Sequence, residues 1–300
     1  MPRGSPRGGP MARQKLDTRA IGLDVGLSFI RWLTGAEHLH YGIWTGLEVT
    51  AGNLRAAQDA YSARLFAHLP DRAGLRILDI GGGAGETAAK LIALGHHVDI
   101  VVPSPFLAGR CRANAPAARV HECKFEDFTG TGPYDLCLFS ESYQYIPLKV
   151  GLARAIALLA PGGEVLIGDC FRSAAFRAGG VKATVGGGHK LQAFRDLVAT
   201  LPLDVVAEED ISVAVAPSID LEQALYHVFG HAVTRIDAEM TVRRPGRWRL
   251  VRWVFDRVTG ERKRARLAQR FLETTRTSEV FLTNNHYMLI RLRPRAADAT

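Results

Sequence analysis

Short apolar runs alternate with stretches of helical periodicity through the middle of the chain. Five of these runs predict strands: Arg76–Ile80, Val98–Val102, Val120–Cys123, Tyr134–Phe139 and Glu164–Asp169. The stretches between them predict helices over Glu86–Leu94, Phe106–Asn114 and Val150–Leu159. Strands separated by helices form βαβ units, so a parallel sheet with helices on both faces is expected.

The segments on either side have other patterns. Residues 22–69 are mainly helical, because apolar residues recur there at spacings of three and four: Leu54, Ala57, Tyr61, Leu65 and Leu69. The pattern after Asp169 predicts a helix over 190–201, a strand near 204–215, a helical block over 219–276 and a closing β-rich run over 279–291. We therefore expect an α/β fold with a seven-stranded, mostly parallel sheet and a helical lid inserted before the last strand.

Composition and charge describe a soluble protein with a basic surface. Hydrophobic residues make up 47% of the chain and charged residues 23%, which is ordinary for a globular protein. The net charge of +8 favours acidic partners, whether nucleic acid, anionic lipid or a small acid. The cysteines are widely spaced and form no C-x-x-C pair, so we expect reduced, mostly buried thiols and neither a metal site nor a disulfide framework: Cys111, Cys123, Cys137 and Cys170.

The N-terminal residues are basic and rich in Gly and Pro, and they lack the apolar stretch of a signal peptide. No later run approaches the ~18 apolar residues that a membrane span requires. This pattern predicts a disordered leader over 1–20 in a cytoplasmic protein.

A glycine-rich turn, Gly81–Gly85, connects the first predicted strand to the helix after it. Ligands of open α/β sheets bind at such turns, outside the carboxyl ends of the strands. The window Gly83-x-Gly85-x-x-Ala88 satisfies the weak dinucleotide fingerprint, whereas Asp79-x-Gly81-x-Gly83-x-Gly85 matches the S-adenosylmethionine pattern. A carboxylate repels a pyrophosphate but attracts an ammonium and a sulfonium, so Asp79 favours S-adenosylmethionine, held also by Gly81, Gly82, Gly83 and Gly85. A dinucleotide site and a purely structural turn are the alternatives.

Several segments resemble the class I S-adenosylmethionine-dependent methyltransferases. The similarity is to the subgroup of gamma-tocopherol and sterol C-methyltransferases, related N-methyltransferases and cyclopropane fatty acid synthases. It covers roughly residues 38–235 and rests on four stretches: 39–44 (LHYGIW) with Ala57-Gln58, Ser104-Pro105, 140–149 (SESYQYIPLK), and 209–212 (EDIS) before Val215-Ala216-Pro217. The stretch 140–149 aligns without a gap with Met-Glu-Ser-Gly-Glu-His-Met-Pro-Asp-Lys of the tocopherol enzymes. The resemblance implies a Rossmann-like sheet and methyl transfer.

The same resemblance suggests further cofactor contacts. Class members often hold the ribose with an acid after the second strand, but Val102 stands there, so Ser104 or nearby backbone is expected to serve instead. Asp99 is too far back along the strand, by roughly 10 Å. An acid and an apolar residue commonly clasp the adenine after the third strand, which indicates Glu126-Asp127-Phe128 together with Phe125. For Glu126 and Asp127 a solvated turn is the alternative. Tyr41 and Trp44 are expected near the sulfonium as cation–π partners, or else only to pack the N-terminal segment. Ser140 is the last of the expected cofactor contacts.

Departures from the subgroup bear on the chemistry. Its Glu-His pair falls on Gln144-Tyr145, which argues against alkene cyclopropanation and removes a strong base. By position, Glu141, Tyr145 and His40 are the remaining candidate proton acceptors. Glu141 has an alternative role as a carboxylate stabilised at a helix N-terminus.

The helical block 219–276 is strongly basic between residues 243 and 270 and carries interleaved Trp and aliphatic residues. Three interpretations stay open: a solvated helix whose Arg stems cover apolar surface, a peripheral contact with an anionic membrane that supplies a lipid-like substrate, or binding of an acidic substrate or RNA. No RNA-binding module accompanies it, so a stable nucleic-acid partner is not expected.

The chain is thus interpreted as a methyltransferase of a small apolar or amphipathic molecule, methylated on carbon, nitrogen or oxygen. Its parts are the leader, an N-terminal helical segment over 21–70 that covers the active site, a core of 71–218 and 277–300, and the lid over 219–276. One alternative is an RNA or protein methyltransferase that uses the basic block. Another is a non-catalytic scaffold, for which Val102, Gln144 and Tyr145 are the evidence. The oligomeric state is left open.

Overall fold

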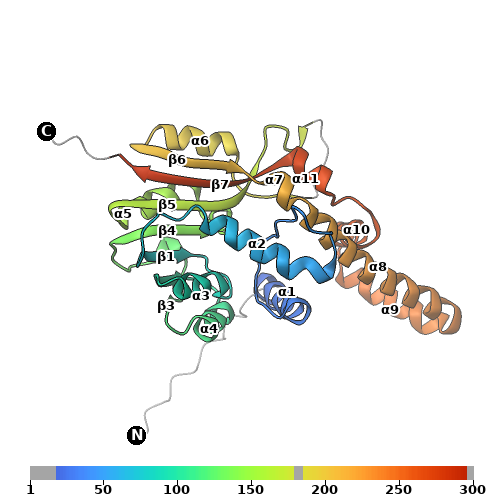
Figure 1. Ribbon diagram of the computed structural model, residues 1–300. Coiled ribbons are helices and arrows are strands. Elements are labelled where there is room, and N and C mark those ends of the chain that lie inside the picture. Colours follow the sequence, from blue (N-terminus) through green and yellow to red (C-terminus); the bar gives the residue numbers. More distant parts are fainter. Residues whose placement is uncertain (1–17, 179–184, 296–300) are drawn as a thin grey trace, which may run out of the picture.

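The computed structural model describes residues 18–178 and 185–295. Its centre is one seven-stranded sheet with the order β3-β2-β1-β4-β5-β7-β6 (Figure 1). The strands are β1 (Arg76–Ile80), β2 (His97–Val101), β3 (Arg119–His121), β4 (Tyr134–Ser140), β5 (Leu159–Arg172), β6 (Leu203–Asp210) and β7 (Asn285–Pro294). Only β7 runs antiparallel to its neighbours β5 and β6 in this sheet. The prediction of a seven-stranded, mostly parallel sheet is confirmed.

Both faces of the sheet are covered by helices. Successive strand residues pack into different cores, so that Ile77 and Leu138 lie in one and Leu78 and Phe139 in the other. The first core is closed by α2 (Leu54–Phe66), α3 (Glu86–Ala93) and α4 (Pro105–Asn114); the second is closed by α5 (Leu148–Ala157) and α6 (Leu191–Ala199). Burial on both faces explains why the strands are continuous apolar runs instead of alternating ones.

The N-terminal segment differs from its prediction in one boundary. Helix α1 (Thr18–Thr34) begins inside the stretch 1–20 that was predicted as a leader. The rest of that stretch, residues 1–17, lies outside the described residues. Short 3-10 helices follow at three points of the chain: η1 (Ala51–Asn53), η2 (Phe125–Asp127) and η3 (Tyr143–Tyr145).

Two predicted strands are partly wrong. The strand near 204–215 ends at Asp210, because Asp210 Oδ1 accepts hydrogen bonds from the backbone N–H (2.9 Å) and the hydroxyl of Ser212 and turns the chain into α7 (Ser212–Val215). The run 279–291 begins as helix α11 (Ser278–Asn284), since the Thr277 hydroxyl caps it by accepting from the Val280 N–H at 3.2 Å. The adjacent apolar residues at 280–282 also lack the alternation of a strand.

Between α7 and α11, three helices form most of the insertion: α8 (Pro217–Arg243), α9 (Pro245–Val258) and α10 (Glu261–Leu272). The predicted block is therefore helical only to residue 272. The outer half of α8, with α9 and α10, projects away from the sheet, and we call residues 228–272 the helical arm (Figure 1). Gly230 lets α10 lie close to α8, because a Cβ there would be 2.0 Å from the carbonyl oxygen of Phe271. Within the described residues, no helix is long and apolar enough to cross a membrane.

The four cysteines are free thiols, as predicted, and three of them are buried. One of these, Cys111 on α4, packs against the glycine turn between β1 and α3. Its Cα would lie 2.9 Å from a Cβ at Gly85, and its thiol contacts the carbonyl oxygen of Gly83 at 3.2 Å. The glycine turn is therefore fixed by its packing against α4.

This packing predicts different costs for two alanine substitutions. Gly85 and Gly95 have nearly the same left-handed backbone, with φ of +89° and +87°, but no atom lies within 4 Å of a Cβ at Gly95. Gly95→Ala should lower the free energy of unfolding by about 1–2 kcal/mol, the cost of the left-handed conformation alone. Gly85→Ala should lose roughly a further 1–3 kcal/mol, because α4 must move. Urea unfolding of both variants measures the difference, and equal losses would contradict the packing argument.

Candidate active site

The glycine turn closes over Asp79 at the end of β1. A Cβ at Gly82 would lie 2.6 Å from Asp79 Oδ2, and one at Gly81 would lie 2.4 Å from the Cβ of Ser142. The Gly81 N–H donates to the carbonyl oxygen of Val101 at 2.7 Å, which ties the turn to the end of β2. Side chains at these two glycines would therefore fill the space that the turn leaves above the carboxyl ends of the strands.

Asp79 is almost completely buried, and its Oδ2 has no hydrogen-bond partner among the described residues. Burial raises the pKa of this carboxyl to about 7. A buried carboxylate without a partner is costly, and a cation placed beside it removes that cost. The turn thus lets a ligand approach the backbone closely, and the Asp79 oxygen beneath it lacks a positive partner among the described residues. These two features suit the ammonium end of S-adenosylmethionine.

The other predicted cofactor residues lie along the same edge of the sheet, in different surroundings. The side chain of Val102 is buried in the core, and the Ser104 hydroxyl caps α4 by accepting from the Leu107 N–H at 3.3 Å. Phe125 is buried in the core on the α5 side, where its ring meets Phe139 edge to face at 5.8 Å. Glu126 is half-buried and Asp127 is exposed. The structure thus separates the Phe125 ring from the two acids that follow it.

Glu141, directly after β4, is the centre of a hydrogen-bonded cluster. Its backbone is left-handed, with φ of +54°, which is rare for a residue with a side chain. Glu141 Oε1 accepts hydrogen bonds from the Tyr41 N–H and from the hydroxyl of Tyr287, each at 2.8 Å. Burial raises the pKa of the Glu141 carboxyl to about 8, although these two donors act in the opposite direction.

A row of hydroxyl groups continues from this carboxyl. The Tyr287 hydroxyl lies 2.9 Å from that of Tyr61, which lies 3.2 Å from the Ser140 hydroxyl. Each hydroxyl has a single proton, so when Tyr287 donates to Glu141, Tyr61 must donate to Tyr287. The row therefore orients the carboxyl through α2 and β7. Ser140, predicted as a cofactor contact, lies in this row.

His40 packs against the same row, with its ring stacked on Tyr61 at 4.4 Å between centroids. His40 Nδ1 lies 2.8 Å from the Tyr41 carbonyl oxygen, which only accepts, so this nitrogen must carry the proton. Nε2 then accepts from His38 Nδ1 at 3.1 Å. Burial lowers the pKa of His40 to about 4. Both ring nitrogens are thus occupied, which disfavours His40 as a proton acceptor.

Tyr41, Trp44 and Tyr145 occupy three different environments. Tyr41 is largely enclosed, and its ring lies edge to face with Phe281 at 6.2 Å. Trp44 packs in a separate apolar cluster, and its indole N–H donates to the Ser218 hydroxyl at 2.8 Å. Tyr145 lies in η3 with 62% of its surface exposed. Of the three, Tyr41 is the one that the structure brings into contact with Glu141.

The segment 35–42 crosses the glycine turn and is held there by ion pairs. Arg110 of α4 donates to both carboxylate oxygens of buried Glu37, at 2.6 and 2.7 Å, and Asn114 donates to it at 2.8 Å. The Glu37 N–H donates in turn to Glu86 Oε1 of α3 at 2.9 Å. The N-terminal segment is thereby fixed to α3 and α4, which both start at the carboxyl edge of the sheet.

Several residues of this site had no sequence signal of their own. Tyr61 was predicted only as part of a helical stripe, and Tyr287 only as part of an apolar run. Asp169 ends the predicted fifth strand. Its carboxyl accepts hydrogen bonds from the backbone N–H groups of Gln144 (3.0 Å) and Cys170 (2.7 Å). Burial raises the pKa of this carboxyl to about 7. An acid at the end of a buried parallel strand was the one available sign for Asp169.

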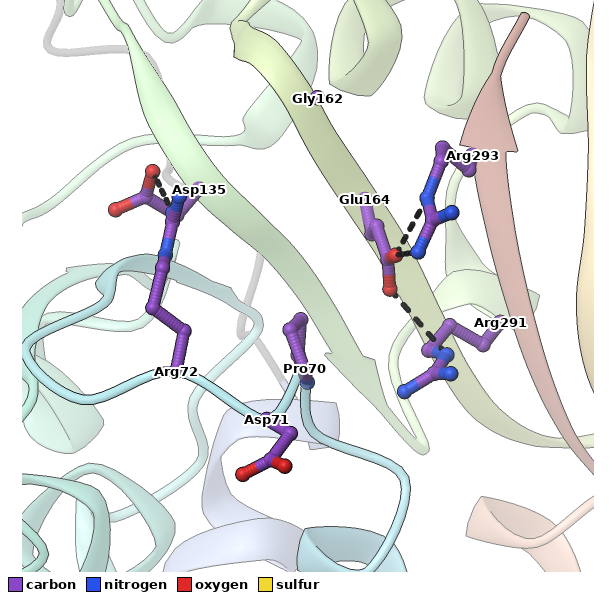
Figure 2. A pocket seen from close by; sticks show the side chains of 8 residues that line it. All are labelled: Pro70, Asp71, Arg72, Asp135, Gly162, Glu164, Arg291 and Arg293. Carbon is purple, nitrogen blue, oxygen red and sulfur yellow. Dashed lines mark hydrogen bonds and ion pairs between the residues drawn. The ribbon is translucent and has the colours of Figure 1, made fainter.

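A separate cavity of about 350 Å³ lies at the amino ends of the parallel strands, opposite the glycine turn (Figure 2). Five of its six charged side chains pair with one another: Glu164 with Arg291 and Arg293, and Arg72 with Asp135. Asp71 forms no ion pair within the described residues. Because most of these charges are already paired, the cavity is a weaker candidate for a ligand site than the carboxyl edge.

Comparisons with known proteins give partial sequence similarity and extensive structural similarity. No protein-family model matches the chain. The chain is 30% identical over 149 residues to 27-O-demethylrifamycin SV methyltransferase of Amycolatopsis mediterranei, covering 44% of this chain and 51% of that protein. It is 31% identical over 124 residues to a ubiquinone biosynthesis O-methyltransferase of Xanthomonas oryzae, covering 39% and 50%. The chain thus spans about half the length of these curated relatives.

Solved structures match nearly the whole chain at low identity. The [4+2]-cyclase SpnF superposes with a TM-score of 0.65 at 14% identity, covering 93% of this chain and 96% of that one. Geranyl diphosphate C-methyltransferase from Streptomyces coelicolor, in complex with S-adenosyl-L-homocysteine, gives 0.61 at 17% identity, covering 89% and 92%. A cyclopropane synthase from Mycobacterium tuberculosis gives 0.62 at 16% identity, covering 94% and 99%. The resemblance predicted from the motifs is therefore confirmed, and the chain has the fold of the class I S-adenosylmethionine-dependent methyltransferases.

Proposed function

We propose that this chain is an S-adenosylmethionine-dependent methyltransferase that acts on a small, apolar or amphipathic molecule. The observation that carries the proposal is the buried Asp79 carboxyl beneath the glycine turn, one oxygen of which has no hydrogen-bond partner among the residues that the structure describes. The ammonium of S-adenosylmethionine is a suitable partner, and a dinucleotide pyrophosphate is not. The names of the two curated relatives, both methyltransferases, support the same activity.

The cofactor would lie along the carboxyl edge, between the glycine turn and the segment 35–42. Asp79 and the backbone of Gly81–Gly83 would hold its methionine end. The Ser104 hydroxyl uses a lone pair to cap α4 and keeps its proton, which is available to a ribose oxygen. Glu126 and Asp127 remain the acids suited to the adenine amino group. Bound there, the cofactor would supply an electrophilic methyl group.

Glu141 is the residue that we propose as general base, for a nucleophile that must lose a proton. Two donors occupy its Oε1, so Oε2 is the oxygen that would take up the proton. With a pKa near 8 the carboxyl is a stronger base than an ordinary carboxylate once it is ionised, and the ionised form predominates only above about pH 8, so the proposed reaction should speed up as the pH rises towards that value. Tyr287 and Tyr61 act as positioning residues, because they orient the carboxyl and do not need to touch the substrate.

The surroundings of Glu141 support an apolar or amphipathic substrate. The rings of Tyr41, Phe281 and Tyr287 lie next to one another on the same side of the sheet. Such a molecule is concentrated at lipid surfaces, so a peripheral association with an anionic membrane would suit this class of substrate.

A reaction other than methyl transfer is the second candidate, since a [4+2]-cyclase shares the fold. The absence of the subgroup's Glu-His pair at Gln144-Tyr145 also favours a departure from the relatives' chemistry. The two reactions differ in what they consume. Methyl transfer forms one S-adenosylhomocysteine for each product molecule, whereas a cyclisation forms none, so chromatographic measurement of S-adenosylhomocysteine during turnover distinguishes them.

Cofactor binding should depend on pH through Asp79. In the free protein this carboxyl is protonated below about pH 7, and pairing with an ammonium requires it to lose the proton. The affinity for S-adenosylmethionine should therefore rise between pH 5.5 and 7, by up to about tenfold per pH unit, and then level off. Isothermal titration calorimetry measures this rise. Adenosine has no ammonium, so its affinity should not change over the same pH range.

Asp79→Asn provides the matching variant. It should bind S-adenosylmethionine about ten- to a hundredfold more weakly at pH 7.5 and lose most of the pH dependence, while its affinity for adenosine stays the same. If the wild-type chain does not bind the cofactor at millimolar concentration, the proposed function is wrong. Binding that is strong but independent of pH would instead remove only the role of Asp79.

The raised pKa of Glu141 predicts how stability changes with pH. The unfolded chain releases this proton near pH 4.5, whereas the folded protein keeps it to about pH 8. The folded state therefore binds more protons between these values, so the free energy of unfolding falls as pH rises from 4.5 to 8. Glu141→Gln removes this contribution. The free energy of unfolding of the variant, relative to that of the wild type, should therefore be higher at pH 9 than at pH 5 by a few kcal/mol.

Urea unfolding at several pH values measures this difference. Asp127→Asn, at an exposed carboxyl of the same sheet edge, is the control and should run parallel to the wild type. A Glu141→Gln curve that also runs parallel would show that the carboxyl is ionised in the folded protein at neutral pH.

A further inference from the structure

The helical arm presents a row of apolar side chains to solvent. On α9, Leu250, Trp253, Val254 and Val258 follow one another at helical spacing and expose 61%, 58%, 46% and 81% of their surface. They therefore form a stripe along one side of the helix. No described residue of α9 is buried, so the part of the chain that the structure describes does not cover this stripe.

The opposite side of α9 is already engaged. The indole N–H of Trp248 donates to Asp237 Oδ1 of α8 at 2.9 Å, and Arg252 lies 3.6 Å from the same carboxylate. These contacts hold α9 against α8. The stripe is consequently turned away from the arm's own packing, and it is presented by a hairpin of helices that projects from the body (Figure 1).

Arginines flank the stripe on the same helix. Arg247, Arg249 and Arg257 are exposed, and none of them forms an ion pair within residues 18–178 and 185–295. The guanidinium of Arg257 lies 5.7 Å from the centroid of the Trp253 ring. Residues 243–272 contain eleven basic and two acidic side chains, so the whole outer arm is strongly positive.

The combination of charge and apolar surface selects among partners. A second copy of the chain would bring two strongly positive arms together, which like charges oppose. RNA would pair with the arginines but would leave the aliphatic side chains of the stripe in water. An anionic membrane satisfies both features, because its phosphates pair with arginines while apolar side chains enter the acyl boundary.

We propose that the α9 stripe docks on an anionic membrane surface, with the helix lying in the plane of the interface. Leu250, Trp253, Val254 and Val258 enter the headgroup–acyl boundary, and Arg247, Arg249 and Arg257 contact lipid phosphates. The docking brings the active site to an amphipathic substrate held in the membrane. That last step rests on the proposed function, whereas the docking itself does not.

Co-sedimentation of the full chain with vesicles tests this proposal. Vesicles of phosphatidylcholine with about 30% phosphatidylglycerol should bind the chain at least tenfold more strongly than pure phosphatidylcholine, and 0.5 M NaCl should weaken that binding. Leu250→Ser with Trp253→Ser should lower the partition coefficient by about tenfold or more. Arg249→Glu with Arg257→Glu should lower it similarly.

Matched controls lie on other elements. Val213→Ser changes an exposed valine of α7, and Arg119→Glu reverses an exposed arginine of β3; both should bind vesicles like the wild type. Circular dichroism and calorimetry with S-adenosylmethionine verify that each variant is folded and that its active site is intact. Cofactor binding without vesicle binding would thus overturn the docking and leave the proposed function standing.

Three further results would overturn the proposal. The first is equal binding of the serine variant and the wild type to anionic vesicles. The second is self-association, seen by light scattering, that the serine variant loses, because a second copy would then be the partner. The third is salt-sensitive binding to an RNA homopolymer by a chain that does not bind the vesicles.

Discussion

One oxygen of Glu141 accepts hydrogen bonds from the Tyr41 backbone and from the Tyr287 hydroxyl, and these donors come from opposite ends of the chain. Through Tyr287 the same contact extends to Tyr61, so β4, β7, α2 and the N-terminal segment meet at a single carboxyl. The left-handed backbone of Glu141 costs about 1–3 kcal/mol, and it persists only where the surroundings hold it. The placement of the N-terminal segment over the sheet edge therefore depends on this contact, together with the Glu37–Arg110 pair beside it.

Two buried carboxyls, Asp79 and Asp169, and the half-buried Glu141 lie at this edge, and their partners give them different capacities. Asp169 accepts two backbone hydrogen bonds and is suited to holding η3 in place. Asp79 has an oxygen without a hydrogen-bond partner in the described part of the chain and is suited to a cation. Glu141 lies between these cases, with one oxygen occupied and the other available. Desolvation raises the pKa of all three, so pairing is the feature that distinguishes Asp169 from Asp79, which we propose for cofactor binding, and from Glu141, which we propose for proton transfer.

The local parts of this arrangement were predictable from the sequence. Strands β1 and β4 were found because both faces of each are buried. Asp79 was found from its spacing to the glycines of the turn, and Glu141 from the aligned stretch 140–149. The contact between Tyr61 and Tyr287 could not be predicted, since the two residues are separated by 226 positions in the chain and meet only through the fold. The start of α11 was missed because the capping Thr277 was outweighed by the apolar run after it. His40 was predicted by resemblance, but the hydrogen bonds that occupy its ring depend on His38 and on a backbone carbonyl that no motif specifies.

The fold alone is compatible with more than one reaction, because a [4+2]-cyclase and C-methyltransferases share it with this chain. What separates such proteins must then be the groups that face the reacting atoms. A cyclisation needs no proton acceptor, whereas methylation of an ionisable nucleophile does. This chain keeps a partly paired carboxyl at the centre of its site and supports it with tyrosines from α2 and β7. Maintaining a desolvated carboxyl and a left-handed backbone is costly, and the base that we propose for methyl transfer would account for both.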